Sequence, residues 1–168
     1  ECIHLIRKTV GPDYPVWVKI NCADFMKEGS MTFADSLQVM QWLSEEKVSA
    51  IEVSGGNMSS LPRQGPIRAI RRTKEPMYFA KYAAQAASLL KGKTDVGVVG
   101  GFRNIQDIEQ CLDTTDLAFI SMCRPFLRQP DLPLLWKTGS TDPALCISCS
   151  RCFGAQDVDC IFHKKEIS

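Results

Sequence analysis

Short apolar runs alternate with amphipathic stretches along most of this 168-residue chain. Runs rich in Val and Ile predict buried strands at 15–21, 49–54, 95–99 and 116–121. Apolar residues three and four positions apart predict helices at 2–10, 33–46, 79–90 and 105–112. Because strands alternate with helices, we expect βαβ units, a parallel sheet and the α/β class.

Polar residues mark where two of these helices begin. Thr32, followed three residues later by Asp35, has the pattern of a capping box. Asn104 is placed to cap the helix that follows it. These signals support the predicted boundaries.

Glycine-rich or polar segments lie at the end of each predicted strand or just after it, at 19–21, 54–56, 100–101 and 123–124. The carboxyl ends of parallel strands meet at one edge of a sheet, where ligands bind in open sheets and in barrels alike. Glycine lets a ligand approach backbone amides, and arginine matches the geometry of phosphate oxygens. Each Gly-Gly pair alone is also ordinary turn chemistry. Together with Arg124, the pairs predict a phosphate site formed by the last two strands.

The composition of the chain gives no indication of binding to nucleic acid or to a membrane. The chain has 20 Lys and Arg against 19 Asp and Glu, a net charge of +1, so overall charge favours neither nucleic acid nor an acidic membrane. It contains no apolar run of membrane-spanning length and no signal peptide pattern. The chain begins at Glu1 without an initiator methionine, so we expect a processed chain or a piece of a longer one.

Four of the eight cysteines crowd together near the end, as Cys146, Cys149, Cys152 and Cys160. Thiolates at such spacing can converge on one metal ion or cluster. An iron–sulfur cluster, a zinc ion and unmetallated thiols all fit the pattern. The chain does not look like a secreted disulfide scaffold, which would be smaller and rich in loops, so we expect a reducing, cytoplasmic compartment.

The motifs at the strand ends also carry a family resemblance. They read, in order, Lys-Ile-Asn, Ile-Glu-Val-Ser-Gly-Gly, Val-Val-Gly-Gly-Phe-Arg and Cys-Arg-Pro-Phe-Leu-Arg-Gln-Pro-Asp-Leu-Pro. This series resembles the Old Yellow Enzyme family of FMN-dependent NADH:flavin oxidoreductases. The closing Cys-Ile-Ser-Cys-Ser-Arg-Cys is similar to the branch that contains 2,4-dienoyl-CoA reductase and trimethylamine dehydrogenase.

The resemblance implies half of a (β/α)8 TIM barrel, equivalent to strands five to eight. Residues 1–138 would form the C-terminal half of an FMN-binding barrel, and residues 139–168 a Cys-rich tail. Four strands cannot close a barrel, so the open edges predict self-association or dependence on a missing N-terminal half-barrel. We expect Ile20 and Val53 to face the barrel interior, where they would lack partners.

The resemblance also implies roles for five residues. Lys19 matches a basic residue, usually arginine, near the N1/O2 edge of the flavin, and would favour the reduced, anionic flavin. Gly100 and Gly101 match backbone that meets the FMN phosphate, and Arg124 matches the arginine that binds it. Cys123 replaces a glycine that the family usually has, which is tolerated only if the φ angle there is negative.

The cysteine cluster matches the family's [4Fe–4S] ligands at Cys146, Cys149 and Cys152. The gap of seven residues before Cys160 is shorter than the family's last gap. In the iron–sulfur case the cluster would relay electrons between the flavin and a further domain. In the zinc case the metal would only hold the tail together.

By resemblance, the chain is part of an ene-reductase type enzyme, in which hydride passes from NAD(P)H through FMN to an activated alkene. No catalytic residue is assigned, because the family's proton-donating groups lie in the other half-barrel and neither His4 nor His163 matches them. The alternative is a non-catalytic half-barrel module that binds a phosphate or flavin weakly, or assembles with a partner.

A basic run in the loop after the second strand comprises Arg63, Arg68, Arg71, Arg72 and Lys74. It either attracts the phosphate of a pyridine nucleotide or CoA, or is simply a solvated loop.

Overall fold

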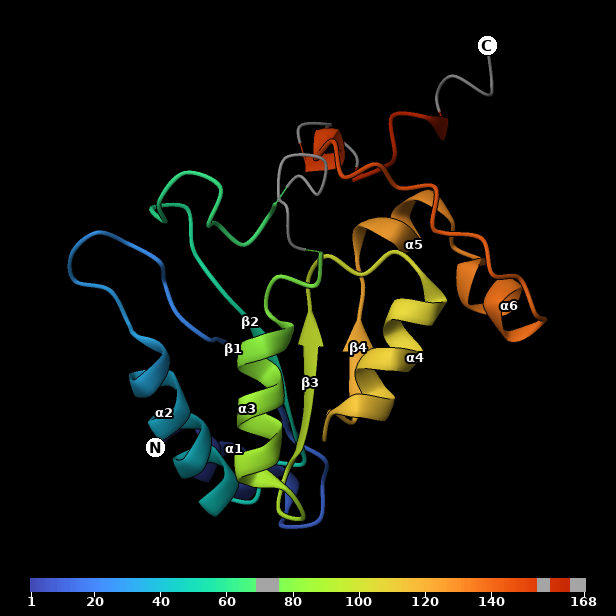
Figure 1. Cartoon of the computed structure of the whole chain (residues 1–168). Helices are drawn as coiled ribbons and strands as arrows, with labels where there is room; N and C mark the ends of the chain where they lie inside the picture. The colour runs from blue at the N-terminus through green and yellow to red at the C-terminus, as the bar shows by residue number, and fades with distance from the viewer. Residues whose placement is uncertain (69–75, 154–157, 164–168) are drawn as a thin grey trace.

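A four-stranded parallel sheet forms the centre of the protein, in the order β1-β2-β3-β4. The computed structural model describes residues 1–68, 76–153 and 158–163. The strands are β1 (Trp17–Asn21), β2 (Ala50–Ser54), β3 (Asp95–Val99) and β4 (Phe119–Ser121) (Figure 1). The predicted α/β class is confirmed, and the four parallel strands are consistent with half of a (β/α)8 barrel.

Four helices alternate with the strands, as the apolar spacing predicts: α1 (Cys2–Val10), α2 (Phe33–Glu45), α3 (Ala80–Leu90) and α4 (Ile105–Thr114). Two short helices follow β4, α5 (Arg124–Arg128) and α6 (Leu132–Lys137), and a 3₁₀ turn lies at Arg151–Phe153. Among the described residues no helix is both long and apolar enough to cross a membrane.

The two predicted helix caps differ in outcome. The Thr32 hydroxyl accepts a hydrogen bond from the Asp35 amide, and the Asp35 carboxylate accepts one from the Thr32 amide at 2.9 Å, so the capping box is confirmed. Asn104 does precede α4, but its side chain donates to the Asp107 carboxylate at 2.8 Å and makes no hydrogen bond to the helix backbone. A nearby carboxylate therefore takes the place of the predicted backbone partner.

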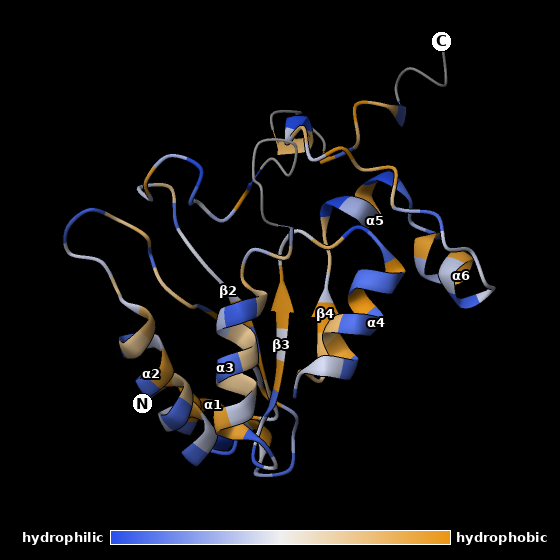
Figure 2. Ribbon diagram, in the orientation of Figure 1, coloured by the Kyte–Doolittle hydropathy of each residue, from blue (hydrophilic) through white to orange (hydrophobic). Residues whose placement is uncertain are grey.

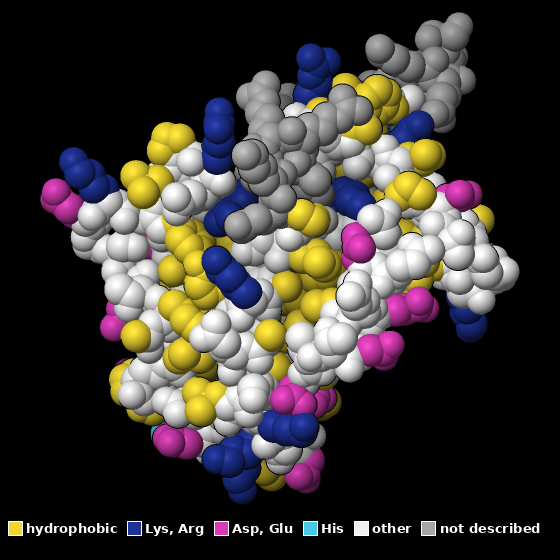
Figure 3. Space-filling view, viewed as in Figure 1, with side chains coloured by type: hydrophobic (Ala, Val, Ile, Leu, Met, Phe, Trp, Pro, Cys, Tyr) yellow, Lys and Arg dark blue, Asp and Glu magenta, His cyan; other side chains and the backbone are white. Residues whose placement is uncertain are grey.

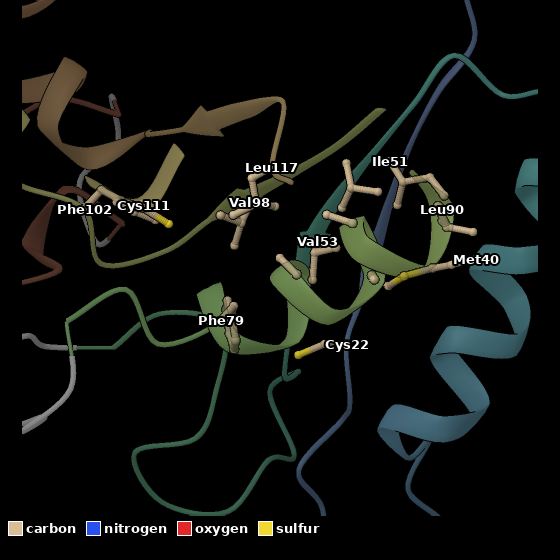
Figure 4. Close-up of a cluster of buried hydrophobic side chains, with 14 of the residues drawn as sticks. Cys22, Met40, Ile51, Val53, Phe79, Leu90, Val98, Phe102, Cys111 and Leu117 are labelled. Carbon is tan, nitrogen blue, oxygen red and sulfur yellow. The ribbon is translucent and has the colours of Figure 1, made fainter. Parts of the chain in front are cut away.

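The hydrophobic core lies between the sheet and α3 (Figures 2 and 4). The side chains of Ile51, Val53 and Val98 are fully buried there, against the small residues Ala83 and Ala86 of the helix. Small residues on the helix face let the helix lie close to the β-branched surface of the strands.

The prediction that Ile20 and Val53 face the barrel interior is wrong. Val53 has no exposed surface, and Ile20 packs against the same core on the helix-covered side of the sheet. Because side chains alternate along a strand, the opposite set points to the other, concave face. That set includes Lys19 and Glu52, which pair across β1 and β2.

The sheet is strongly curved toward this concave face. Trp17 of β1 and Phe119 of β4 stack with ring centroids 5.0 Å apart, although two strands separate them. In a flat sheet these strands would lie about 14 Å apart, three spacings of roughly 4.8 Å. The missing side chain at Gly97 makes room, since a Cβ atom there would lie 2.3 Å from the Phe119 ring.

We predict that Gly97→Ala destabilises the protein by about 1–3 kcal/mol, because the added methyl group must displace the Phe119 ring. Urea unfolding measures the effect as a lower transition midpoint. Gly65→Ala is the control, because a Cβ there meets its nearest atom at an ordinary 3.5 Å. Equal midpoints for Gly97→Ala and wild type would contradict the described packing.

Candidate functional site

A cavity of about 270 Å³ opens at the carboxyl edge of the sheet. Lys19, Gly100, Gly101, Cys123 and Arg124 all line it, so the structure brings together the five residues that the sequence assigns to a cofactor. In Figure 3, Lys and Arg side chains gather round the end of the visible face where β3 and β4 end. The fold thus concentrates basic groups at this edge.

The Gly100-Gly101 turn after β3 requires glycine for two reasons. Both residues have positive φ angles, +121° and +90°, which other residues rarely adopt. A Cβ atom would also lie 2.6 Å from the Tyr78 ring at Gly100, and 2.5 Å from the Met77 amide nitrogen at Gly101. The turn therefore presents bare backbone to the cavity.

Cys123 adopts a φ angle of −115°, which any residue accommodates. Cysteine in place of the family's usual glycine therefore adds no backbone strain. Its thiol is exposed and lines the cavity beside Arg124.

Two arginines, Arg103 and Arg124, line the cavity from the loops after β3 and β4. Arg124 is only 9% exposed. Burial lowers the pKa of Arg103, and the positive charge of Arg124 lowers it further. Within the described part of the chain, neither guanidinium forms an ion pair with a carboxylate. Two neighbouring, poorly solvated cations without a counter-charge favour binding of an anion.

Neutral groups of the chain hold both guanidiniums in place. Arg124 donates to the Ser150 hydroxyl and to the Arg68 carbonyl, each at 3.1 Å. Arg103 donates to the Cys146 carbonyl at 3.2 Å and to the Ser148 hydroxyl at 2.6 Å. The acceptors lie in the tail and in the loop after β2, and the arginines in the loops after β3 and β4, so four separate segments meet around the cavity.

Lys19 differs from expectation in its charge environment. Its ammonium group pairs with the Glu52 carboxylate, whose other oxygen accepts a hydrogen bond from the Ser121 hydroxyl at 2.7 Å. Glu52 therefore balances the positive charge of Lys19, and it is a site residue that the sequence analysis did not assign. The position of Glu52 in the Ile-Glu-Val-Ser strand could have indicated this role, because a charged residue between β-branched residues must face away from the core.

The first glycine pair does not line this cavity. Gly55 packs against Phe79, and its Cβ position would lie 2.6 Å from that ring. Gly56 donates its amide to the Ala23 carbonyl at 2.8 Å. This pair shapes a turn, which is the simpler of the two interpretations of such a motif.

Only part of the basic run after β2 can be placed, since Arg71, Arg72 and Lys74 lie outside the described residues. The Arg68 guanidinium lies 4.8 Å from the ring centroids of both Tyr78 and Phe79, and it donates to the Gly65 and Gln64 carbonyls. Its side chain therefore fixes the loop to the aromatic residues before α3.

The tail crosses above the carboxyl ends of β3 and β4 (Figure 1). Its four clustered cysteines line a second, small cavity, and Arg124 lines this cavity as well as the first one. Burial raises the pKa of the Cys152 thiol, and nearby Cys146 and Cys149 act in the same direction. Across the described ranges, however, no three His, Cys, Asp or Glu side chains already stand in a metal-binding arrangement.

Both histidines bind partners away from the cavity at the sheet edge. His4 lies 2.6 Å from the Glu46 carboxylate. His163 contacts the Asp159 carboxylate at 2.8 Å and the Arg128 carbonyl at 2.9 Å. Neither residue is placed for chemistry in the cavity.

Comparisons with known proteins show which proteins the chain resembles. No family model matches the chain. It is 27% identical to an NADH oxidase of Thermoanaerobacter brockii over 161 residues, which cover 93% of the chain and 23% of that protein. It is 26% identical to the NADH-dependent flavin oxidoreductase iliE of Neonectria sp. (strain DH2), over 79% of the chain and 18% of that protein.

The fold has a solved counterpart. A structure of a 2-naphthoyl-CoA reductase with 2-naphthoyl-CoA superposes on 89% of the chain with a TM-score of 0.72 and 22% identity. The match covers 22% of the reductase chain. The chain is therefore similar to oxidoreductases, and it spans about a quarter or less of their length.

We predict that Cys22 resists alkylation in the folded protein, because burial raises the pKa of its thiol to about 12. The exposed Cys123 thiol should react with iodoacetamide at pH 8 at least about ten times faster. Mass spectrometry of the tryptic peptides measures both rates. In urea the two thiols should react alike, whereas equal rates in the folded protein would contradict the burial of Cys22.

Proposed function

We propose that the chain is the C-terminal part of an NAD(P)H-dependent flavin oxidoreductase, and that the cavity at the sheet edge binds the phosphate of FMN. One observation carries the proposal. Arg103 and Arg124 share a cavity with the Gly100-Gly101 turn, and no carboxylate within the described ranges neutralises either cation. Bare backbone beside two guanidinium groups suits a phosphate monoester.

Different residues of the cavity would bind different parts of FMN. Arg103 and Arg124 would hold the phosphate oxygens, and the glycine turn would let the group lie against the backbone. Lys19, paired with Glu52, would lie toward the flavin ring, as the resemblance implies. Bound FMN would accept hydride from NAD(P)H and deliver it to an electron-poor alkene. The chain's own residues bind and orient the cofactor, and none is assigned to proton transfer.

The remainder of the barrel would complete the enzyme. The chain spans 23% of the length of the NADH oxidase it matches, and the outer strands β1 and β4 each pair on one side only within the described sheet. Unpaired strand edges bind further strands readily. We propose that a preceding half-barrel, or a second copy of the chain, pairs with them and that the substrate is a small molecule.

The four cysteines of the tail form the second part of the proposal. Cys146, Cys149, Cys152 and Cys160 surround one cavity and would hold a [4Fe–4S] cluster, with zinc as the alternative. They fit as a donor set in type and number, but the thiolates would have to move closer together on binding. A cluster there would lie next to the proposed flavin site, because Arg124 lines both cavities.

We predict that Arg124→Ala weakens FMN binding about 10- to 100-fold, because it removes a charge-assisted hydrogen bond to the phosphate. Quenching of flavin fluorescence measures the Kd. Arg63→Ala, in the exposed part of the loop after β2, is the matched control and should bind FMN like wild type.

Riboflavin, which lacks the phosphate, tests whether Arg124 binds the phosphate group or another part of FMN. Arg124→Ala should discriminate less between FMN and riboflavin than the wild type does. A wild-type chain that does not bind FMN would refute the flavin proposal and favour the non-catalytic module.

We predict that the anaerobically purified chain contains roughly four iron and four sulfide ions, with a broad brown absorbance. Cys149→Ser should lose most of both, whereas Cys2→Ser, at an exposed cysteine outside the tail, should keep them. Metal analysis and visible absorption test this. A colourless sample with one zinc ion would support the alternative, and a metal-free chain after reconstitution would refute both.

A further inference from the structure

Arg124 lies between the two cavities and contacts both. Its Nη1 atom donates to the Ser150 hydroxyl, in the segment Cys146–Cys152 that carries three of the four clustered cysteines. Its Nη2 atom donates to the Arg68 carbonyl on the other side. The guanidinium that lines the proposed phosphate site is thus held by the cysteine segment from one side and by the loop after β2 from the other.

Two serine hydroxyl groups of the cysteine segment point toward the arginines of the cavity. Ser148 and Ser150, on either side of Cys149, have positive φ angles of 57° and 60°. Ser148 is 1% exposed and accepts a hydrogen bond from Arg103, while Ser150 accepts one from Arg124. Alternate residues of one short segment therefore bind the two arginines of the cavity.

Both acceptors are neutral hydroxyl groups, and this affects how strongly the arginines can bind an anion. Two cations close together repel each other, so without restraint their side chains would turn apart. A carboxylate would hold them but would also neutralise them and compete with a bound anion. A hydroxyl group orients a guanidinium through a hydrogen bond and leaves its positive charge available. Orientation before binding reduces the entropy lost when the ligand arrives.

We propose that Ser150 is a positioning residue, which orients Arg124 and thereby makes the cysteine segment a determinant of the affinity of the cavity for a phosphate monoester. The inference rests on the proposed function and adds to it that the cysteine segment orients one arginine of the phosphate site.

The test is a double-mutant cycle with FMN as the probe. We expect Ser150→Ala to raise the Kd for FMN about 3- to 10-fold, which corresponds to the loss of one hydrogen bond. Ser150→Gly, which suits the positive φ angle, should show the same loss, so that backbone strain is not its cause. Ser140→Ala, earlier in the tail, is the matched control and should bind FMN like wild type.

The second arm uses Arg124→Ala as the background. If Ser150 acts through Arg124, adding Ser150→Ala to Arg124→Ala causes no further loss of FMN affinity. Additive losses, or wild-type affinity in both Ser150 variants, would overturn the inference and leave the proposed function intact. A wild-type chain that binds no FMN would overturn the proposed function and this inference with it.

Discussion

The packing of Val and Ile side chains from β2 and β3 against α3 determines the direction of every other side chain in the sheet. Ile51, Val53 and Val98 are fully buried beneath the helix, so their neighbours along each strand must point to the concave face. Lys19, Glu52 and Ser121 are placed there, and Glu52 joins the other two. The polar floor of the candidate site is thus a consequence of how the core packs.

The curvature of the sheet has the same origin. Helices cover one side of the sheet, and the missing side chain at Gly97 on the other side lets Trp17 and Phe119 meet. Bending draws the carboxyl ends of the strands toward one another, and the loops that follow them enclose the cavity. Arg103 and Arg124, from successive loops, are therefore close enough for the charge of one to lower the pKa of the other.

Local sequence patterns predicted most of the fold but fewer of the contacts at the site. Val and Ile runs marked the strands, and β3 has the predicted bounds because Gly-Gly follows it directly. The five assigned cofactor residues share a cavity because four of them follow β3 or β4 and Lys19 lies on the concave face of β1. The position of Val53 on the barrel interior was predicted wrongly, although the charged Glu52 beside it indicates that Val53 lies on the opposite, helix-covered face.

Contacts between distant segments left no signal in the sequence. The hydrogen bonds of Arg103 and Arg124 to Ser148 and Ser150 join residues 26 to 45 positions apart. The pairing of Glu52 with Lys19 depends on strand register, which alternation alone does not fix. These contacts position the charged side chains of the candidate site relative to one another.

The central claim is that an anion is bound between the Gly100-Gly101 turn and the two arginines. Titration of the ¹⁵N-labelled chain with FMN, followed by NMR, tests it most directly. We predict that the largest saturable shifts fall on the amides of Gly100, Gly101 and Arg124 and on the Nε–H groups of Arg103 and Arg124. Shifts confined to other surfaces, or no shifts at saturating FMN, would contradict it.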